Sequence, residues 1–399
     1  MQPNTIKPIE QNQRTAIVDI LRGWALLGVV MMNYIDFASF ESSTTKPHHT
    51  DLGSTITYYI MNILFAAKSW TLLSLLFGYG FAVLINNLQK KGYNAPKFFA
   101  KRMFWLFVLA FINCALFFGD ILKDYAFIGL LMILFYRISG KAALISALIL
   151  IALIPFMYPL LTKLWPYDYS KAVDSLMPLY HSRLPGTFAF NLKGTWLLEV
   201  IFPLYLIPVH LTQLACMLLG LSAYRYNIFN RLIDYKKYIK RTWLITLCAG
   251  TLLTVLGIVS WKYKFTYRNY VNLSTITVLC TMLFIASSVC LLYMAGKLKK
   301  FFASLSFFGK MTLTNYMTQN VISLFLFTGA GLGIYSSLHP AVYVGIGIGV
   351  YILQVFFSKW WLANYNYGPV EWLWRQLSYG KRLPIKKGKA QPAAILQQA

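Results

Sequence analysis

Asp19 and Arg22 are charged residues inside the first long apolar stretch of the chain, RTAIVDILRGWALLGVVMMN (14–33). A charged side chain at membrane depth costs about 2.5–3.5 kcal/mol on insertion scales, so such residues mark candidate functional sites by default. At spacing i, i+3 the two side chains share one helix face and can neutralise each other. The pair could line the path of a charged ligand, or it could be a structural ion pair near the membrane surface.

Further polar residues that could take part in chemistry lie at the edges of apolar segments. Asp120, in FFGDILKDYAFIG, faces a cavity or complements the dipole at a helix start. Glu199 precedes an apolar segment that also holds a histidine and a glutamine. His48 and His49 lie in the polar stretch SSTTKPHHTD, where an imidazole titrating near neutral pH could act as a general base. A solvated loop pair is the alternative for these two histidines.

Asn315 and Gln319 belong to the polar segment GKMTLTNYMTQN. Their amides could bond across helices or contact a substrate. The glycines of FGYG, GAGLG and GIGIG are predicted to lie in apolar helices that pack closely, because no phosphate-binding or hydrolase motif surrounds them. No residue set indicates a metal site or a prosthetic group.

The composition is that of a membrane protein. Of the 399 residues, 58% are hydrophobic and 12% charged, and the mean hydropathy is +0.55. Runs of about 18 or more apolar residues recur, and each indicates a membrane helix. We therefore predict an all-α polytopic membrane protein. The net charge of +25 fits cytoplasmic loops retained by the positive-inside rule, and no nucleic-acid motif accompanies it.

About ten transmembrane helices are predicted, with both termini in the cytoplasm, because this orientation leaves most Lys and Arg residues inside. Their approximate bounds are 16–39, 68–88, 102–119, 121–137, 141–162, 201–223, 242–260, 270–294, 311–330 and 340–358. Residues 55–67 extend the second span or lie along the interface.

We predict one transmembrane domain, residues 1–380, and a basic, disordered cytoplasmic tail, 381–399. The long outer segment 163–200 is predicted to fold over the membrane domain. The stretch GPVEWLWRQLSYG (368–380) is predicted to be an amphipathic helix on the cytoplasmic surface, with a mainly structural role.

Several stretches together resemble the YeiB-like family of uncharacterised bacterial inner-membrane proteins, the domain-of-unknown-function-418 group. They run in order across residues 14–380, and residues 225–385 best match the family's C-terminal domain. The matching stretches are DILRGWALLGVVMMN, LLSLLFGYGF, FFGDILKDYAFIGLL, MLLGLSAYRYNIF, GKMTLTNYMTQN and YGPVEWLWRQLSYG.

A wider resemblance is to membrane-bound acyltransferases that modify extracytoplasmic sugars. Their O-acyltransferase branch has an essential histidine eleven positions after an arginine of the first helix, where this chain has Asn33 after Arg22. The heparan-type N-acetyltransferase branch has an RG…NY pattern, matched by Arg22-Gly23 and Asn33-Tyr34, and a histidine in the following outer loop, where this chain has His48 and His49.

Three functions are compatible with these residues. The first is transfer of an acyl group from a cytoplasmic, acyl-CoA-type donor to an extracytoplasmic glycan or lipid. Asp19, Arg22 and Asn33 would line the path and His48 or His49 would be the base, while Arg22 would pair with the donor phosphates or hold Asp19. The second is transport of a small solute or lipid-linked molecule without covalent chemistry, in which the cavity groups would be Asp19, Arg22, Asp120 and Glu199. The third is a non-catalytic membrane scaffold. Membrane lipids are expected partners in each case, and nucleic acid in none.

Overall fold

The computed structural model describes residues 15–38, 51–164, 169–335 and 338–387. Within these ranges the chain is almost entirely helical, apart from one isolated β-bridge between Tyr365 and Lys386. Seven apolar helical stretches are long enough to cross a membrane. The all-α polytopic membrane class is thus confirmed, while the count of ten spans and the cytoplasmic termini stay predictions.

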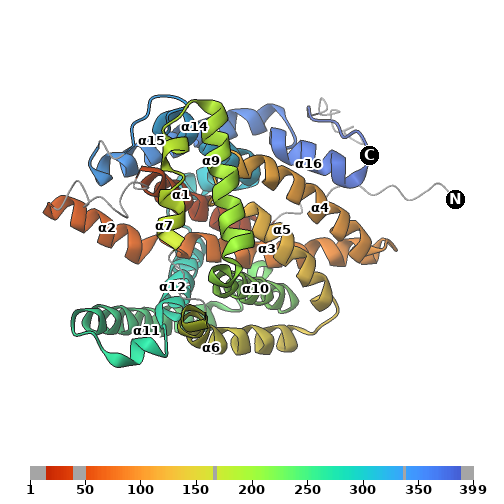
Figure 1. Ribbon diagram of the computed structural model, residues 1–399. Coiled ribbons are helices and arrows are strands. Elements are labelled where there is room, and N and C mark those ends of the chain that lie inside the picture. Colours follow the sequence, from red (N-terminus) through yellow and green to blue (C-terminus); the bar gives the residue numbers. More distant parts are fainter. Residues whose placement is uncertain (1–14, 39–50, 165–168, 336–337, 388–399) are drawn as a thin grey trace, which may run out of the picture.

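Figure 1 shows the arrangement of the helices, most of which are joined by short connections. Their bounds are α1 Ala16–Ala38, α2 Leu52–Leu64, α3 Lys68–Lys90, α4 Ala95–Cys114, α5 Leu122–Met132, α6 Gly140–Leu164, α7 Tyr169–Asp174, α8 Met177–Tyr180, α9 Leu184–Trp196, α10 Pro203–Arg225, α11 Lys236–Lys262, α12 Ser274–Met294, α13 Lys299–Lys310, α14 Thr312–Phe327, α15 Pro340–Asn364 and α16 Pro369–Tyr379. Short 3-10 turns lie at Ile133–Phe135, Ile228–Asn230 and Thr266–Asn269, and a π-helical turn, η4, at Leu197–Ile201.

The apolar stretch before α3 is a separate helix. The chain turns between Leu64 and Lys68, and Ala67 takes a positive φ of 61° there. Asp51 begins α2, because its carboxylate accepts a hydrogen bond from the Ser54 N–H at 3.1 Å. Residues 55–67 therefore do not continue the second span as one helix, and α2 packs against α15.

The core of the bundle is built around α1. This helix packs against α3, α13, α14 and α15, and 67% of the residues in its apolar 18-residue stretch are buried inside the protein. The corresponding share for α11 is 11%, so α11 presents most of its apolar surface to the outside, as expected for a helix in contact with lipid. Asp19 and Arg22, in the first half of α1, are thus held in the interior and not on the lipid-facing surface.

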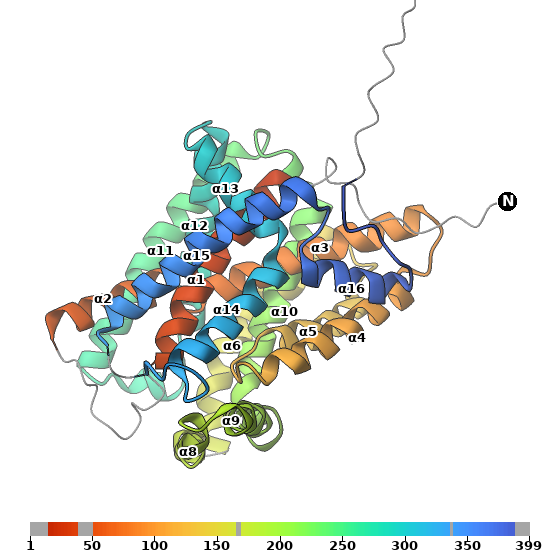
Figure 2. The same cartoon turned by 90° about the horizontal axis from the view of Figure 1, so that it is seen from above.

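The bundle has two distinct ends, with α8 and α9 at one and α13 at the other (Figure 2). We call the α13 end inner and the α8–α9 end outer, following the predicted orientation. The predicted folding of residues 163–200 is confirmed for its described part, which forms α7, α8 and α9. The Tyr180 hydroxyl donates to the Phe37 carbonyl at 2.5 Å, and Asn191 Nδ2 to the Ala115 carbonyl at 3.0 Å. These bonds fasten the segment onto the outer ends of α1 and α4.

The last described residues return to the end of α15. The Asn366 N–H donates to the Ile385 carbonyl at 2.8 Å, and the Lys387 N–H to the Asn364 carbonyl at 3.1 Å. Residues 388–399 of the predicted tail lie outside the described ranges.

Candidate functional site

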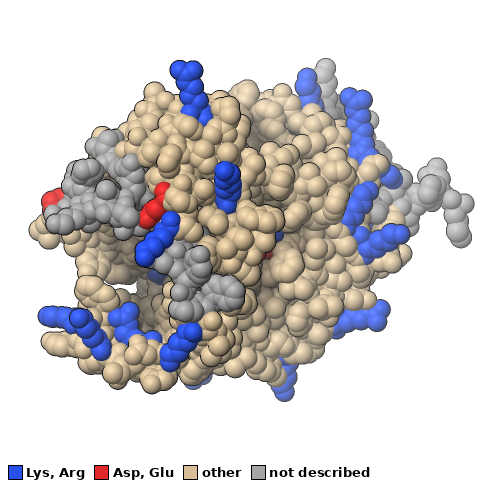
Figure 3. Space-filling model, in the orientation of Figure 1, with Lys and Arg blue, Asp and Glu red and all other residues tan. Residues whose placement is uncertain are grey.

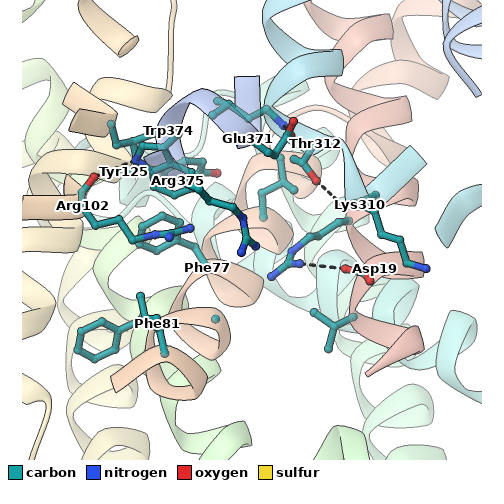
Figure 4. A pocket seen from close by; sticks show the side chains of 18 of the residues that line it. Asp19, Phe77, Phe81, Arg102, Tyr125, Lys310, Thr312, Glu371, Trp374 and Arg375 are labelled. Carbon is teal, nitrogen blue, oxygen red and sulfur yellow. Dashed lines mark hydrogen bonds and ion pairs between the residues drawn. The ribbon is translucent and has the colours of Figure 1, made fainter. Parts of the chain in front are cut away.

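A pocket of about 340 Å³ lies near the inner end of the bundle, between α1, α3, α4, α14 and α16. We call it the inner pocket. Its charged lining residues are Asp19, Arg22, Arg102, Lys310, Glu371 and Arg375. Figure 4 shows side chains from α1, α4 and α16 turned toward a shared space, with Arg102 and Arg375 on the side opposite Asp19.

The Asp19–Arg22 pair forms as its spacing predicts. Arg22 Nη1 donates to Asp19 Oδ1 at 3.0 Å, and the Asp19 side chain is only 3% exposed against 29% for Arg22. The buried carboxylate is thus neutralised by a cation that still reaches the pocket. A ligand in the pocket would meet the guanidinium before it met the carboxylate.

Arg102 and Arg375 are held in the pocket wall by aromatic rings. The Arg102 guanidinium lies 3.8 Å from the centroid of the Trp374 ring, and the Trp374 indole N–H donates to the Arg102 carbonyl at 2.9 Å. The Arg375 guanidinium lies 4.6 Å from the centroid of the Tyr367 ring. Stacking of this kind orients a planar cation while leaving its edge able to bind an anion.

Glu371 connects α16 to α14. Its carboxylate accepts the Leu313 N–H at 2.6 Å and the Thr314 N–H at 3.1 Å, so it caps the first turn of α14. Burial raises the pKa of the Glu371 carboxyl, and the bonds from Thr314 and Leu313 act in the opposite direction. Both carboxylates of the inner pocket therefore have protein partners, and four cationic side chains surround them.

The deeper lining of the inner pocket is apolar. Leu26, Leu73, Phe77, Met103 and Leu106 contribute to it. Such a combination of a cationic rim and an apolar interior suits an amphiphile with an anionic head group.

Two tyrosines, Tyr125 and Tyr316, also line the pocket, and Tyr316 connects it to a buried polar network. The Tyr316 hydroxyl donates to Asp120 Oδ1 at 3.0 Å, and Asn113 Nδ2 donates to the same oxygen at 2.7 Å. Asp120 is fully buried, is not among the residues that line the inner pocket, and also accepts a backbone hydrogen bond from Leu122 at the start of α5. Its two alternative roles both stay predictions.

Beyond Asp120, toward the outer end, lies a group of charged and polar residues that we call the outer cluster: Lys123, Asp124, Glu199, His210 and Gln213. The Lys123 ammonium lies 2.9 Å from Glu199 Oε1 and 3.2 Å from Asp124 Oδ1, and donates to the Asp120 carbonyl at 2.6 Å. His210 Nε2 lies 3.5 Å from Asp124 Oδ1. Gln213 Nε2 donates to Asp124 Oδ2 at 3.5 Å.

The outer cluster has the spacing of a metal site. One ligand atom each from Asp124, Glu199 and His210 lies within 4.8 Å of the others. The Lys123 ammonium already lies within ion-pair distance of both carboxylates and offsets one of their two negative charges. The cluster can therefore hold a proton-accepting imidazole beside a carboxylate without a metal ion.

The remaining predicted site residues lie elsewhere. Asn33 is half-buried on α1, about 21 Å along the helix from Asp19. Asn315 Nδ2 donates to Ser358 Oγ at 3.0 Å, and Gln319 Nε2 donates to Gln354 Oε1 at 2.8 Å, so both amides join α14 to α15. These bonds favour the interhelical role over substrate contact. His48 and His49 lie outside the described residues.

Several residues of the two sites are not predicted from the sequence. Arg102, Lys310 and Arg375 were not singled out as site residues, and Glu371 was given only a structural role in an amphipathic surface helix. In the structure α16 packs on α4 and forms a wall of the inner pocket. The available signal was the Glu371–Arg375 spacing of i, i+4 beside two tryptophans, which marks a charged face but not the groove that it covers.

Comparisons with known proteins agree with this architecture. Residues 223–381 match the sequence model of a family described as "Protein of unknown function (DUF418)". The uncharacterized protein YxaH of Bacillus subtilis (strain 168) is 28% identical over 407 residues, which cover 96% of this chain and 99% of YxaH. An uncharacterized 39.9 kDa protein in the amylase 3' region of Bacillus acidopullulyticus is 26% identical, with 95% and 97% covered.

A third relative, the uncharacterized protein YeiB of Escherichia coli (strain K12), is 25% identical over 92% of this chain and 96% of its own length. No solved structure matches. These findings confirm the predicted resemblance: the chain is similar over nearly its whole length to the YeiB and YxaH proteins, and its residues 223–381 match the DUF418 family.

Proposed function

We propose that this protein is an acyltransferase of the bacterial inner membrane that moves an acyl group from a cytoplasmic donor to an extracytoplasmic glycan or lipid. The observation that carries the proposal is the bond from Tyr316 to Asp120. It joins an anion-binding, apolar pocket at the inner end to an imidazole–carboxylate cluster at the outer end.

The donor side of the reaction requires a long apolar chain and an anionic head, as in an acyl-CoA-type thioester. Arg22, Arg102, Lys310 and Arg375 supply cations for the phosphates, and the leucines and Met103 between α1, α3 and α4 supply a surface for the chain. Bidentate arginine contacts suit phosphate geometry particularly well.

The acceptor side requires a base. In the proposed step, the acceptor hydroxyl oxygen bonds to the thioester carbonyl carbon while the carbon–sulfur bond breaks. His210 accepts the hydroxyl proton, with Asp124 stabilising the imidazolium, and the imidazolium then gives this proton to the thiolate released beside it. His48 and His49 remain the alternative bases.

The donor site is tested by binding of a long-chain acyl-CoA to purified protein. Arg102→Gln and Arg375→Gln should each weaken binding about five- to tenfold, in line with the loss of a charge-assisted contact. Lys101→Gln is the matched control, because this exposed lysine on the same helix as Arg102 is absent from the pocket lining. Equal affinity of all three variants and the wild type would rule out this donor site.

The reaction is tested by mass spectrometry of envelope lipids and glycans from deletion cells carrying wild-type or variant protein. His210→Ala should lose the same acyl mass as the deletion, while the matched control His181→Ala on the outer segment should retain it. A loss with His48→Ala or His49→Ala but not with His210→Ala would move the base to the loop. An envelope unchanged by the deletion would contradict acyl transfer.

Transport is the second candidate function, and the outer cluster favours it. A buried Asp124 beside the partly buried side chains of Lys123, Glu199 and His210 is the kind of cluster that forms proton relays in transporters. Transport predicts solute movement into or out of vesicles containing the purified protein, sensitive to His210→Ala, with no covalent product.

A further inference from the structure

A second, larger hollow lies on the side of the bundle, at the outer half. It has a volume of about 1380 Å³ and lies between the ends of α2, α6 and α11 and the start of α12. We call it the lateral groove. Figure 3 shows basic side chains gathered beside a hollow on this part of the outer face, below and to the left of its centre.

The charge of the lateral groove has one sign. Among the described residues, its lining includes the five cations Lys68, Lys163, Lys262, Lys264 and Arg268, and no aspartate or glutamate. The positive-inside rule disfavours such a concentration of cations at the outer side of a membrane. A local anionic occupant would account for it.

Lys68 is the strongest indication of that occupant. Its residue is only 7% exposed, and its ammonium donates a hydrogen bond to the Asn62 carbonyl at the end of α2. That carbonyl accepts a hydrogen bond from one of the three N–H groups of the Lys68 ammonium. No carboxylate in the described part of the chain forms an ion pair with Lys68. A buried ammonium without a counter-charge is costly, and an anion entering the groove would offset the cost.

The groove also borders surface that contacts lipid. Ile63 of α2 and Ile258 of α11 line it and are 40% and 48% exposed, and Trp261 is 67% exposed. Aromatic and basic residues together are typical of the head-group region of a membrane. The Lys163 ammonium, 4.4 Å from the Tyr270 ring centroid, shows the same combination inside the groove.

We propose that the lateral groove binds the head-group phosphate of an anionic phospholipid from the outer leaflet. Lys68 contacts the phosphate at the base of the groove, and Lys163 and Arg268 contact it at the rim. The acyl chains lie along the exposed apolar faces of α2 and α11. This site is separate from the inner pocket and does not depend on the function proposed above.

The test is lipid retention in nanodiscs containing equal phosphatidylglycerol and phosphatidylcholine, followed by native mass spectrometry. Wild-type protein should retain phosphatidylglycerol preferentially. Each of Lys163→Gln and Arg268→Gln should reduce the preference about fivefold, since one cation near an anionic surface contributes about that factor. Because both side chains are exposed, these variants test the site without disturbing the core.

Lys68→Met should remove most of the remaining preference. The matched control is Lys193→Gln, an exposed lysine of α9 that is absent from the groove lining and should leave the preference unchanged. Equal loss in Lys193→Gln and the groove variants would overturn the proposal. So would displacement of the lipid by millimolar glycerol 3-phosphate, which would identify a soluble anion as the ligand.

Discussion

At the scale of single residues, the buried charge of Asp19 has its counter-charge close by in the sequence. Asp19 is 2% exposed and has Arg22 one turn away, a contact that the i, i+3 spacing predicts without any tertiary information. The outer cluster is different. Asp124 lies on α5, Glu199 in η4 and His210 on α10, and only the packing of α5 and η4 against α10 brings them together. Sequence reasoning found Glu199 as a candidate but could not join it to its partners.

Removing Arg22 should reveal how much an unpaired Asp19 charge destabilises the protein. We expect Arg22→Ala to lower the free energy of unfolding by about 3 kcal/mol, because a buried carboxylate would lose its counter-charge. Asp19→Asn in the Arg22→Ala background should recover most of that loss, since a neutral amide needs no cation. Chemical denaturation in detergent micelles measures both values. Equal stability of the single and double variants would show that the pair contributes no coupling energy.

At the scale of elements, α1 and α13 approach so closely that glycine is required on both. A Cβ on Gly309 would lie 1.9 Å from the Asp19 carbonyl oxygen, and one on Gly23 would lie 2.3 Å from the Leu305 carbonyl oxygen. Both contacts involve backbone, which cannot rotate away. This approach holds Asp19 and Lys310 at the same pocket.

Gly309→Ala should therefore destabilise the protein by about 1–3 kcal/mol through overpacking. Gly345→Ala is the matched control: the Cβ would meet nothing within 4 Å on α15, and alanine is the better helix former. Thermal unfolding of the two variants measures the difference. Comparable melting temperatures would mean that α1 and α13 can separate without loss.

The three glycine motifs illustrate a limit of sequence reasoning. Gly78 of FGYG does lie at a close helix contact, 2.0 Å from its Cβ position to the Met217 carbonyl oxygen, as predicted. Gly349 of GIGIG faces open space, and GAGLG is not helical, because α14 ends at Phe327 and the motif forms the following turn. The three similar glycine motifs therefore lie in three different environments, which are distinguished only by the neighbours that the tertiary fold places beside them.

The contribution of the α2–α15 junction to the stability of the protein should depend on pH. Hydrogen bonds from Ser54 and His339 hold the pKa of Asp51 below its usual value of about 3.9. Because the folded-state pKa is the lower one, Asp51 stabilises the fold above about pH 4, and the effect is lost as the pH falls toward the folded-state pKa. The wild type should melt at a higher temperature than Asp51→Ala at about pH 5 to 6, and this difference should shrink by about pH 3.

Thermal unfolding of both proteins across that range checks the prediction. Asp234→Ala, an exposed carboxylate far along the chain from this junction, is the control and should show no comparable difference. A melting difference that is constant with pH would assign the effect of Asp51→Ala to something other than its charge.

At the scale of the whole molecule, hydropathy predicts the long helices but not how these helices pack against one another. The turn that separates α2 from α3 was not predicted, because Ala67, which takes the positive φ there, is not a residue that marks a turn. The role of α16 depends on Glu371 reaching Thr314, a residue 57 positions earlier. Pocket walls of this kind arise from long-range packing, which the local pattern does not encode.

Orientation is the property on which the proposed direction of transfer depends, and α12 offers a direct test. Tyr263 precedes this helix and is 64% exposed at the outer end, while Lys297 follows it at the inner end and is also exposed. The 21 residues of α12 span about 30 Å, enough to cross the hydrocarbon core. In a background in which the five cysteines are replaced by serine, an impermeant maleimide should label Tyr263→Cys on intact cells. It should label Lys297→Cys only after permeabilisation. The reverse pattern would put the inner pocket outside and contradict a cytoplasmic donor, and labelling of both on intact cells would show that α12 does not cross the membrane.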